Sequence, residues 1–171
     1  MPPPVHVDPG QLDLKRIVAD QEAIRRVNPQ RYEMEHLNAV VLLDPEQQLI
    51  AGYRDVRGDE FWVRGHMPDY PLLPGVLMCE AAAQLASFYI TTQGLGHGDF
   101  VGLGGLENVR FRSTVHPGDR LVLVGKCGKA NRRQMIFNVQ GFVGSTMVFH
   151  ADIVGLPLTR REPGSTEAAA E

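Results

Sequence analysis

The chain has 171 residues, of which 43% are hydrophobic, and it carries a formal net charge of −3. This length suits one domain with a substantial core, and the small acidic balance gives no reason to expect nucleic acid or a membrane as partner. No apolar run approaches the roughly 20 residues that a membrane span needs. Residues 1–10 lack the pattern of a secretory signal, so we expect a cytoplasmic protein.

The first part of the chain predicts a surface helix followed by strands. Residues 1–10 are rich in proline and are expected to be disordered. Residues 11–27 place apolar side chains at near-helical spacing among charged ones, which predicts a helix that ends before Asn28-Pro29. Three strands are predicted next, the first two as a hairpin, over residues 37–44, 48–56 and 60–65.

The stretch from Gly65 to Thr92 divides into a proline-rich loop and a long helix. Three prolines in its first half lack an amide N–H and favour extended geometry in the residues before them. After Pro74 and Gly75 the sequence contains no proline or glycine until Gly94, which stands where a C-cap would. Four alanines among larger apolar residues predict that this helix, at about residues 75–92, is buried.

The remainder of the chain predicts mainly strands. Residues 93–105 contain six glycines and are expected to be mostly loop. The polar residues 159–171 are expected to form a disordered tail. Together the elements predict a single α+β domain over residues 11–158, an antiparallel sheet wrapped around the long helix. The four strands predicted in this part span residues 106–115, 120–130, 134–144 and 145–158.

Polar residues around the long helix suggest acid–base chemistry. Glu80 and Gln84 lie four residues apart and share one helix face, and a buried carboxylate needs a partner or a purpose. The loop before the helix could fold back and bring His66 opposite Glu80, as a general acid/base pair. The free amide of Gly75 at the helix start could polarise a carbonyl. This combination suits removal of a proton next to a carbonyl group.

The same spacing has plainer interpretations. A histidine before a helix is more often a hydrogen-bonded structural residue, and short motifs often match by chance. A zinc site made of His66, Cys79 and Glu80 is disfavoured, because neighbouring helix residues point about 100° apart. We therefore predict no metal site. The two cysteines, Cys79 and Cys127, fit a reducing compartment without a disulfide.

A resemblance adds to these observations. The run HMPDYPLLPGVL from His66 to Leu77, followed by Glu80-Ala81 and Ala83-Gln84, closely resembles the signature of the 3-hydroxyacyl-acyl-carrier-protein dehydratases. A second block, NVRFR at 108–112 and VHPGDRL at 115–121, is similar to the strand and turn that follow the helix in that family. The resemblance implies the hot-dog fold and a place in type II fatty acid synthesis.

The resemblance also implies roles for individual residues. His66 matches the catalytic histidine and Glu80 the catalytic acidic residue, a glutamate as in the broad-chain-length branch. Gly75 matches the glycine whose amide polarises the thioester carbonyl. Gln84 matches a glutamine that supports the acidic side chain, and the carbonyl of Leu72 would orient the histidine. The implied reaction removes water from a (3R)-hydroxyacyl thioester and gives the trans-2-enoyl thioester.

The resemblance further implies partners and leaves some questions open. The acyl substrate would be attached to the phosphopantetheine of acyl carrier protein, with no other cofactor. Subunits would form a homodimer or a trimer of dimers, with residues of two subunits in each site. Residues 33–36 are charged where the family is apolar, which leaves acyl chain length and carrier open. Two other functions stay open, a hot-dog acyl thioesterase and a non-catalytic acyl-binding protein.

Overall fold

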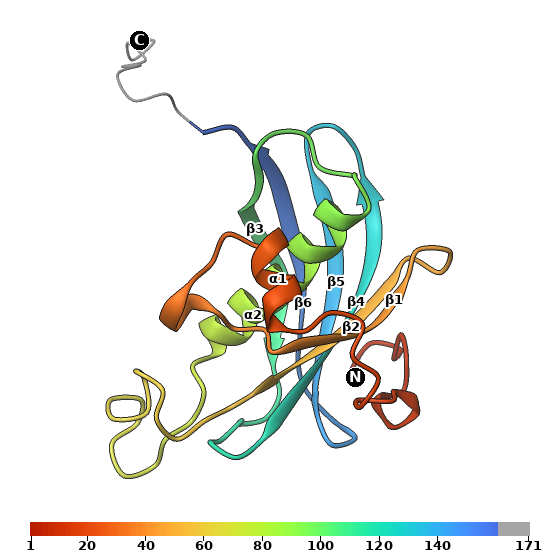
Figure 1. The fold of residues 1–171 in the computed structure, drawn as a ribbon. Coiled ribbons are helices and arrows are strands. Elements are labelled where there is room, and N and C mark those ends of the chain that lie inside the picture. Colours follow the sequence, from red (N-terminus) through yellow and green to blue (C-terminus); the bar gives the residue numbers. More distant parts are fainter. Residues whose placement is uncertain (161–171) are drawn as a thin grey trace.

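The computed structural model describes residues 1–160 and shows one curved sheet around one long helix (Figure 1). Six antiparallel strands form the sheet in the order β1-β2-β4-β5-β6-β3, so that β1 and β3 are its edges. The strands are β1 (Ala39–Asp44), β2 (Leu49–Asp55), β3 (Phe100–Phe111), β4 (Arg120–Ala130), β5 (Met135–Val143) and β6 (Thr146–Leu158).

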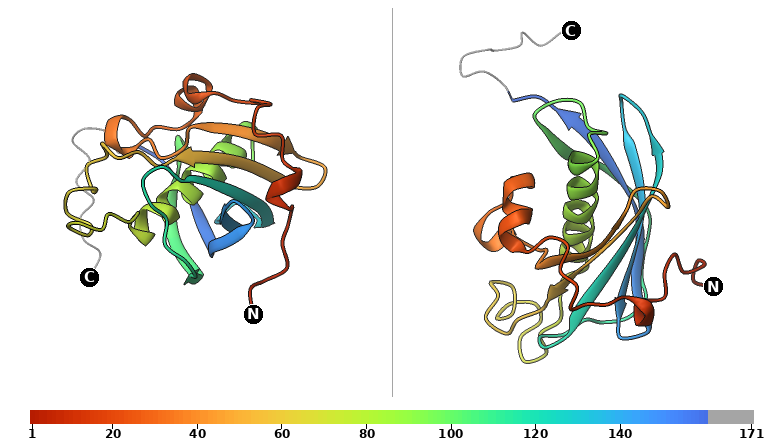
Figure 2. Two further views of the ribbon diagram at one scale, coloured as in Figure 1. Left: turned by 90° about the horizontal axis from the view of Figure 1, so that it is seen from below. Right: turned by 45° about the vertical axis from the view of Figure 1, so that its right-hand side comes forward.

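Helix α2 (Gly75–Thr92) lies inside the curve of the sheet (Figure 2). Leu85 is fully buried against inward-facing side chains such as Leu123 and Phe137. Gly94 adopts the left-handed conformation at φ 64° that ends helices, and the Leu95 N–H closes the last turn on the Ile90 carbonyl. The predicted helix and the predicted α+β architecture are confirmed, as is the hairpin of β1 and β2.

The opposite face of the sheet carries a second apolar cluster, which the N-terminal segment covers. Val7, Leu12 and Leu14 of that segment pack on side chains that alternate with the core residues along their strands. Figure 2 shows the segment crossing the sheet on the side away from α2. The covered residues are Val41, Ala51, Val122, Val124 and Phe142.

Hydrogen bonds also attach the N-terminal segment to the sheet. The buried side chain of Gln140 accepts from the His6 N–H at 3.0 Å and donates to the Pro4 carbonyl at 2.8 Å. These contacts oppose the predicted disorder of residues 1–10, because they satisfy a buried amide that would otherwise lack partners. The domain boundaries at residues 11 and 158 stay a prediction.

Two predicted elements near the start of the chain are wrong. The helix expected over residues 11–27 is confined to α1 (Gln21–Val27), because Ala19 pairs with Val40 of β1 and the Asp20 side chain caps the helix at the Ala23 N–H. Residues 60–65 form turns instead of a strand, since the Glu60 carboxylate binds local donors such as the Trp62 indole N–H. Short 3₁₀ turns occur at η1 (Pro9–Gln11) and η2 (Tyr32–Met34).

The glycine-rich stretch is only partly a loop. Residues 93–99 contain no strand, as expected, but β3 begins at Phe100. A Cβ at Gly102 would lie 2.2 Å from the side chain of Leu158, and one at Gly104 would lie 2.3 Å from that of Leu156. These glycines therefore make room for large side chains of β6 across the strand pair.

Two further observations concern the ends and the helices. The predicted disorder of residues 159–171 falls largely on residues 161–171, which lie outside the described residues. Within residues 1–160, no helix has both the length and the apolar character needed to cross a membrane.

We expect the N-terminal segment to stabilise the fold. Replacing Leu12 and Leu14 together by alanine should lower the free energy of unfolding by about 2 kcal/mol, because both side chains are partly buried on the outer cluster. Urea unfolding followed by the fluorescence of the single tryptophan, Trp62, measures this. Val5→Ala is the control, since Val5 is half exposed and should change stability by less than about 0.5 kcal/mol. An unchanged midpoint in the double variant would contradict the role.

Candidate functional site

His66 lies in the loop that joins β2 to α2, and the chain folds locally to hold its ring. The Nδ1 atom lies 2.9 Å from the Leu72 carbonyl oxygen, and the Leu72 N–H donates to the His66 carbonyl at 3.0 Å. A carbonyl oxygen only accepts hydrogen bonds, so Nδ1 carries the proton and Nε2 is left able to accept one. The structure thus makes the contact that was expected between Leu72 and His66.

His66 and Gly75 share a hollow of about 530 Å³, here called the His66 hollow. Gly75 is the first residue of α2, and its N–H has no hydrogen-bond partner among residues 1–160. A side chain at Gly75 would strike the ring of Phe111, because its Cβ would lie 2.7 Å from that ring. The hollow is lined by His66, Leu72, Leu73, Pro74, Gly75, Val76, Met78, Phe111, Ser113 and Thr114.

Glu80 lines a different hollow, of about 190 Å³, here called the Glu80 hollow. This hollow runs between α2 on one side and strands β3 and β6 on the other, and most of its lining is apolar. Its residues are Pro29, Gln30, Glu80, Ala83, Ala86, Ser87, Ile90, Phe100, Val101, Gly102, Leu103, Ile153 and Gly155.

The structure does not bring His66 and Glu80 together within one chain. The two hollows share no lining residue, and no hydrogen bond joins the two side chains in residues 1–160. The helix explains the separation, because Gly75 and Glu80 are five residues apart and point about 140° apart around the axis. One group therefore contains His66, Leu72 and Gly75, and a second contains Glu80 and Gln84.

The side-chain amide of Gln84 orients the Glu80 carboxylate. Its Nε2 donates to Glu80 Oε1 at 2.7 Å and to the Met34 carbonyl at 2.6 Å, while its Oε1 accepts from the His36 N–H at 2.9 Å. These partners distinguish the oxygen of the Gln84 amide from its nitrogen, and the nitrogen faces Glu80. Only 2% of Gln84 is exposed. No sequence pattern predicts the roles of Met34 and His36, because both residues act through backbone atoms.

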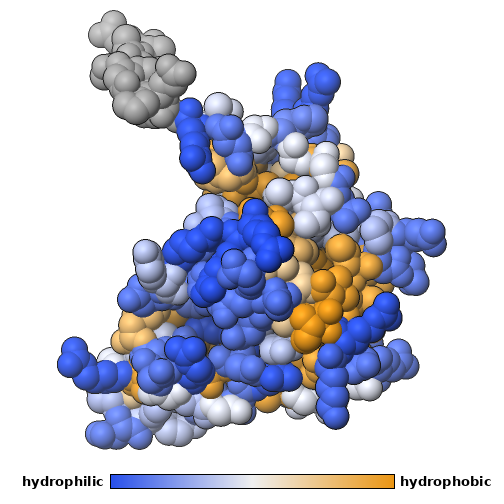
Figure 3. Space-filling view, viewed as in Figure 1, coloured by the Kyte–Doolittle hydropathy of each residue, from blue (hydrophilic) through white to orange (hydrophobic). Residues whose placement is uncertain are grey.

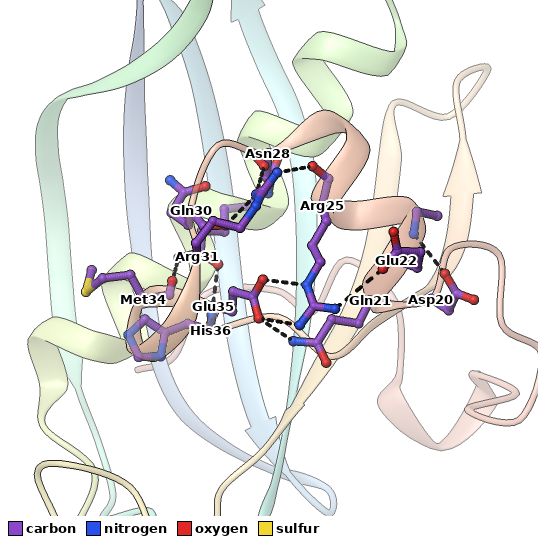
Figure 4. Close-up of polar contacts among 12 residues, drawn as sticks. Asp20, Gln21, Glu22, Arg25, Asn28, Gln30, Arg31, Met34, Glu35 and His36 are labelled. Atoms are coloured by element: carbon purple, nitrogen blue, oxygen red, sulfur yellow. Dashed lines mark hydrogen bonds and ion pairs between the residues drawn. The ribbon is translucent and has the colours of Figure 1, made fainter.

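A charged cluster holds the segment that contains Met34 and His36 (Figure 4). The Arg25 guanidinium of α1 binds both carboxylate oxygens of Glu35, at 2.6 and 2.9 Å, and lowers the pKa of that carboxyl. Arg31 donates to the Arg25 carbonyl at 2.7 Å. The surface over α1 is accordingly hydrophilic in Figure 3. The charges that depart from the family's apolar pattern thus fix the backbone around Gln84.

His36 itself is buried beside an ion pair. It is 1% exposed, and neither ring nitrogen has a hydrogen-bond partner within the described part of the chain. Burial lowers the pKa of His36 to about 4, and the neighbouring Arg54 guanidinium, which is paired with Glu60, adds to the effect. The ring is therefore neutral in the folded protein near pH 7.

Comparisons with known proteins show the family to which this sequence is similar. A family described as the FabA-like domain matches residues 28–152. A 3-hydroxyacyl-[acyl-carrier-protein] dehydratase FabZ of Acinetobacter baylyi is 33% identical over 79% of this chain and 92% of its own length. The FabZ of Desulfotalea psychrophila is 28% identical over 86% of this chain and 95% of its own.

Solved structures show the same fold at low identity. The dehydratase heterocomplex ApeI:P from Xenorhabdus doucetiae matches with a TM-score of 0.66 and 16% identity, over 79% of this chain and 90% of its own. Cj0977, a sigma28-regulated virulence protein from Campylobacter jejuni, matches with a TM-score of 0.61 and 18% identity, over 82% and 94%. The predicted hot-dog fold is confirmed.

Buried His36 should make stability depend on pH. Its pKa is about 4 in the fold and about 6.5 in the unfolded chain, so between these values only the unfolded chain binds the proton. The free energy of unfolding should therefore fall by about 2 kcal/mol from pH 7 to pH 5 through this residue. In the variant His36→Leu this part of the fall should vanish, as measured by urea unfolding at both pH values. The exposed His97→Leu is the control, and equal falls in the wild type and His36→Leu would contradict the prediction.

Proposed function

The chain belongs to the FabA-like family, and on that basis we propose that it removes water from a (3R)-hydroxyacyl thioester carried by acyl carrier protein. The product is the trans-2-enoyl thioester. Relatives named as dehydratases of this kind match most of the chain. The observation that carries the proposal is the geometry around His66, with an oriented imidazole and a free helix-start amide in one hollow.

In this proposal His66 is the base. Its Nδ1–H is held by the Leu72 carbonyl, which leaves Nε2 to take the proton from C2 of the substrate. The negative charge that develops on the thioester oxygen is stabilised by the Gly75 N–H and the positive end of α2. Most of the lining of the His66 hollow is apolar, and low polarity around the reacting groups strengthens both effects.

Glu80 is the acid that helps the C3 hydroxyl leave. Gln84 donates to Oε1 of Glu80, so the other carboxyl oxygen is left to carry the proton to the hydroxyl, directly or through a water. The bond from C3 to oxygen breaks as the C2–C3 double bond forms, and water departs. His66 and Glu80 exchange protons only with substrate and water, so the proposed reaction needs no metal or other cofactor.

Two subunits supply the proposed site. Because His66 and Glu80 line separate hollows, His66 of one subunit acts with Glu80 of a second copy in a homodimer. Strand β3 supports this arrangement, since it is a long edge strand that pairs only with β6 among residues 1–160. It exposes Leu103, Leu106 and Phe111, and an apolar edge of this kind favours pairing with another chain. Three such dimers could assemble further, and the protein would act in the cytoplasm.

The acid/base assignment is tested by hydration of trans-2-enoyl thioesters, the reverse reaction, followed at the enoyl absorbance. His66→Ala and Glu80→Gln should each lower kcat by about 10²–10⁴-fold, as expected for loss of a positioned acid or base. His6→Ala and Glu22→Gln are matched controls outside both hollows and should keep wild-type rates.

If the wild type hydrates no enoyl thioester, on acyl carrier protein or on coenzyme A, the proposed reaction is wrong. Release of free thiol in the same samples would then indicate a thioesterase. Full activity in a folded His66→Ala variant would show that His66 is not the base.

A further inference from the structure

The Glu80 hollow follows one face of α2. Glu80, Ala83, Ser87 and Ile90 recur at intervals of three and four residues and so lie on one helix face. Glu80 lies at one end of this set of residues and Ile90 at the other. The end of the hollow near Ile90 is apolar, whereas the charged group stands at the other end. A straight alkyl chain fits this distribution of polarity.

A second, smaller hollow of about 80 Å³ lies beyond the end of α2. It is lined by glycine-rich residues of the loop before β3, and only Phe100 and Val101 line both hollows. Strand β3 therefore supplies the wall between them. The residues of this second hollow are Thr91, Gly96, His97, Gly98, Asp99, Phe100 and Val101.

Val101 stands at the centre of this wall. Its Cγ1 lies 3.0 Å from where a Cβ on Gly155 would be, and Gly155 lines the Glu80 hollow. Its Cγ2 lies 3.6 Å from where a Cβ on Gly96 would be, and Gly96 lines the second hollow. One methyl group thus faces each hollow, and both glycines leave the space that the valine fills.

The size of the hollow limits the chain that it can hold. A water molecule occupies about 30 Å³ in the liquid and a methylene is of similar size, so the 190 Å³ of the Glu80 hollow holds roughly six methylenes. The carbonyl carbon, C2 and C3 remain at the reacting groups, outside this count. The second hollow would add room for roughly three more methylenes.

We infer that the Glu80 hollow binds the acyl chain and that Val101, with Phe100 beside it, ends the hollow, so that the preferred acyl groups have about eight to ten carbons. This inference rests on the proposed dehydratase function and adds a chain-length limit to it. Each methylene buried before the wall adds roughly fourfold to affinity. Longer chains gain nothing further and meet the Val101 side chain.

The test measures kcat/KM for hydration of trans-2-enoyl thioesters of increasing length, together with calorimetric binding of the saturated acyl pantetheine thioesters. The wild type should favour chains of about eight to ten carbons and lose at least about tenfold several carbons beyond them. Val101→Ala joins the two hollows and should move the optimum to longer chains by two or more carbons. Gly155→Ala adds a methyl group 3.4 Å from Ile90 Cδ1 and should move the optimum to shorter chains.

Val109→Ala is the matched control, because Val109 is a partly buried valine of the same strand that lines neither hollow. It should keep the wild-type length profile, and unfolding midpoints show whether each variant folds. A wild type that accepts much longer chains equally well would overturn the inference, as would a Val101→Ala profile that matches that of Val109→Ala. Binding does not require catalysis, so an inactive protein whose binding optimum still moves in Val101→Ala would reject the proposed reaction and keep the end wall.

Discussion

The buried amide of Gln84 is the contact on which the arrangement of this protein depends. It joins the central helix to the segment before β1 through the Met34 carbonyl and the His36 N–H, and it holds Glu80 with its remaining donor. Gln84 is only 2% exposed, so losing one of these bonds leaves a buried polar atom of its amide unpaired. The Asn28 side chain also donates a hydrogen bond of 2.9 Å to the backbone carbonyl of Gln84, which attaches the end of α1 to the same residue of α2.

Helix α2 is apolar on almost every side, and its few polar groups line separate hollows. Residues of α2 point in all directions around the helix axis. Gly75 therefore lines the His66 hollow, whereas Glu80 lines the Glu80 hollow on another side of the helix. In the proposed reaction, which needs both groups, they would come from two copies of the chain. The exposed apolar edge at β3 and the separated hollows both support the proposed dimer.

The sequence predicted best what local chemistry decides. Helix α2 follows from the run without proline or glycine between Pro74 and Gly94, and the contact of Leu72 with His66 follows from the family motif.

Tertiary contacts decide the features that the sequence did not predict. Gly102 looked like a loop residue, yet it lies in β3 because Leu158 needs the space above it. Residues 11–19 have helical spacing, yet Ala19 pairs with Val40 at the sheet edge. The division of His66 and Glu80 between two hollows also depends on the path of the loop that holds His66 against Leu72, which spacing along the chain does not reveal.

Mixing of inactive subunits tests the central claim most directly. Purified His66→Ala and Glu80→Gln proteins are dissociated together, reassociated and assayed for hydration of enoyl thioesters. If each site takes His66 from one subunit and Glu80 from its partner, about half of the dimers are mixed and each has one intact site of two, so about a quarter of wild-type activity should return. If both residues act within one chain, no mixed dimer contains an intact site. Activity that stays at the level of the separate variants, with exchange of subunits demonstrated, would contradict the account.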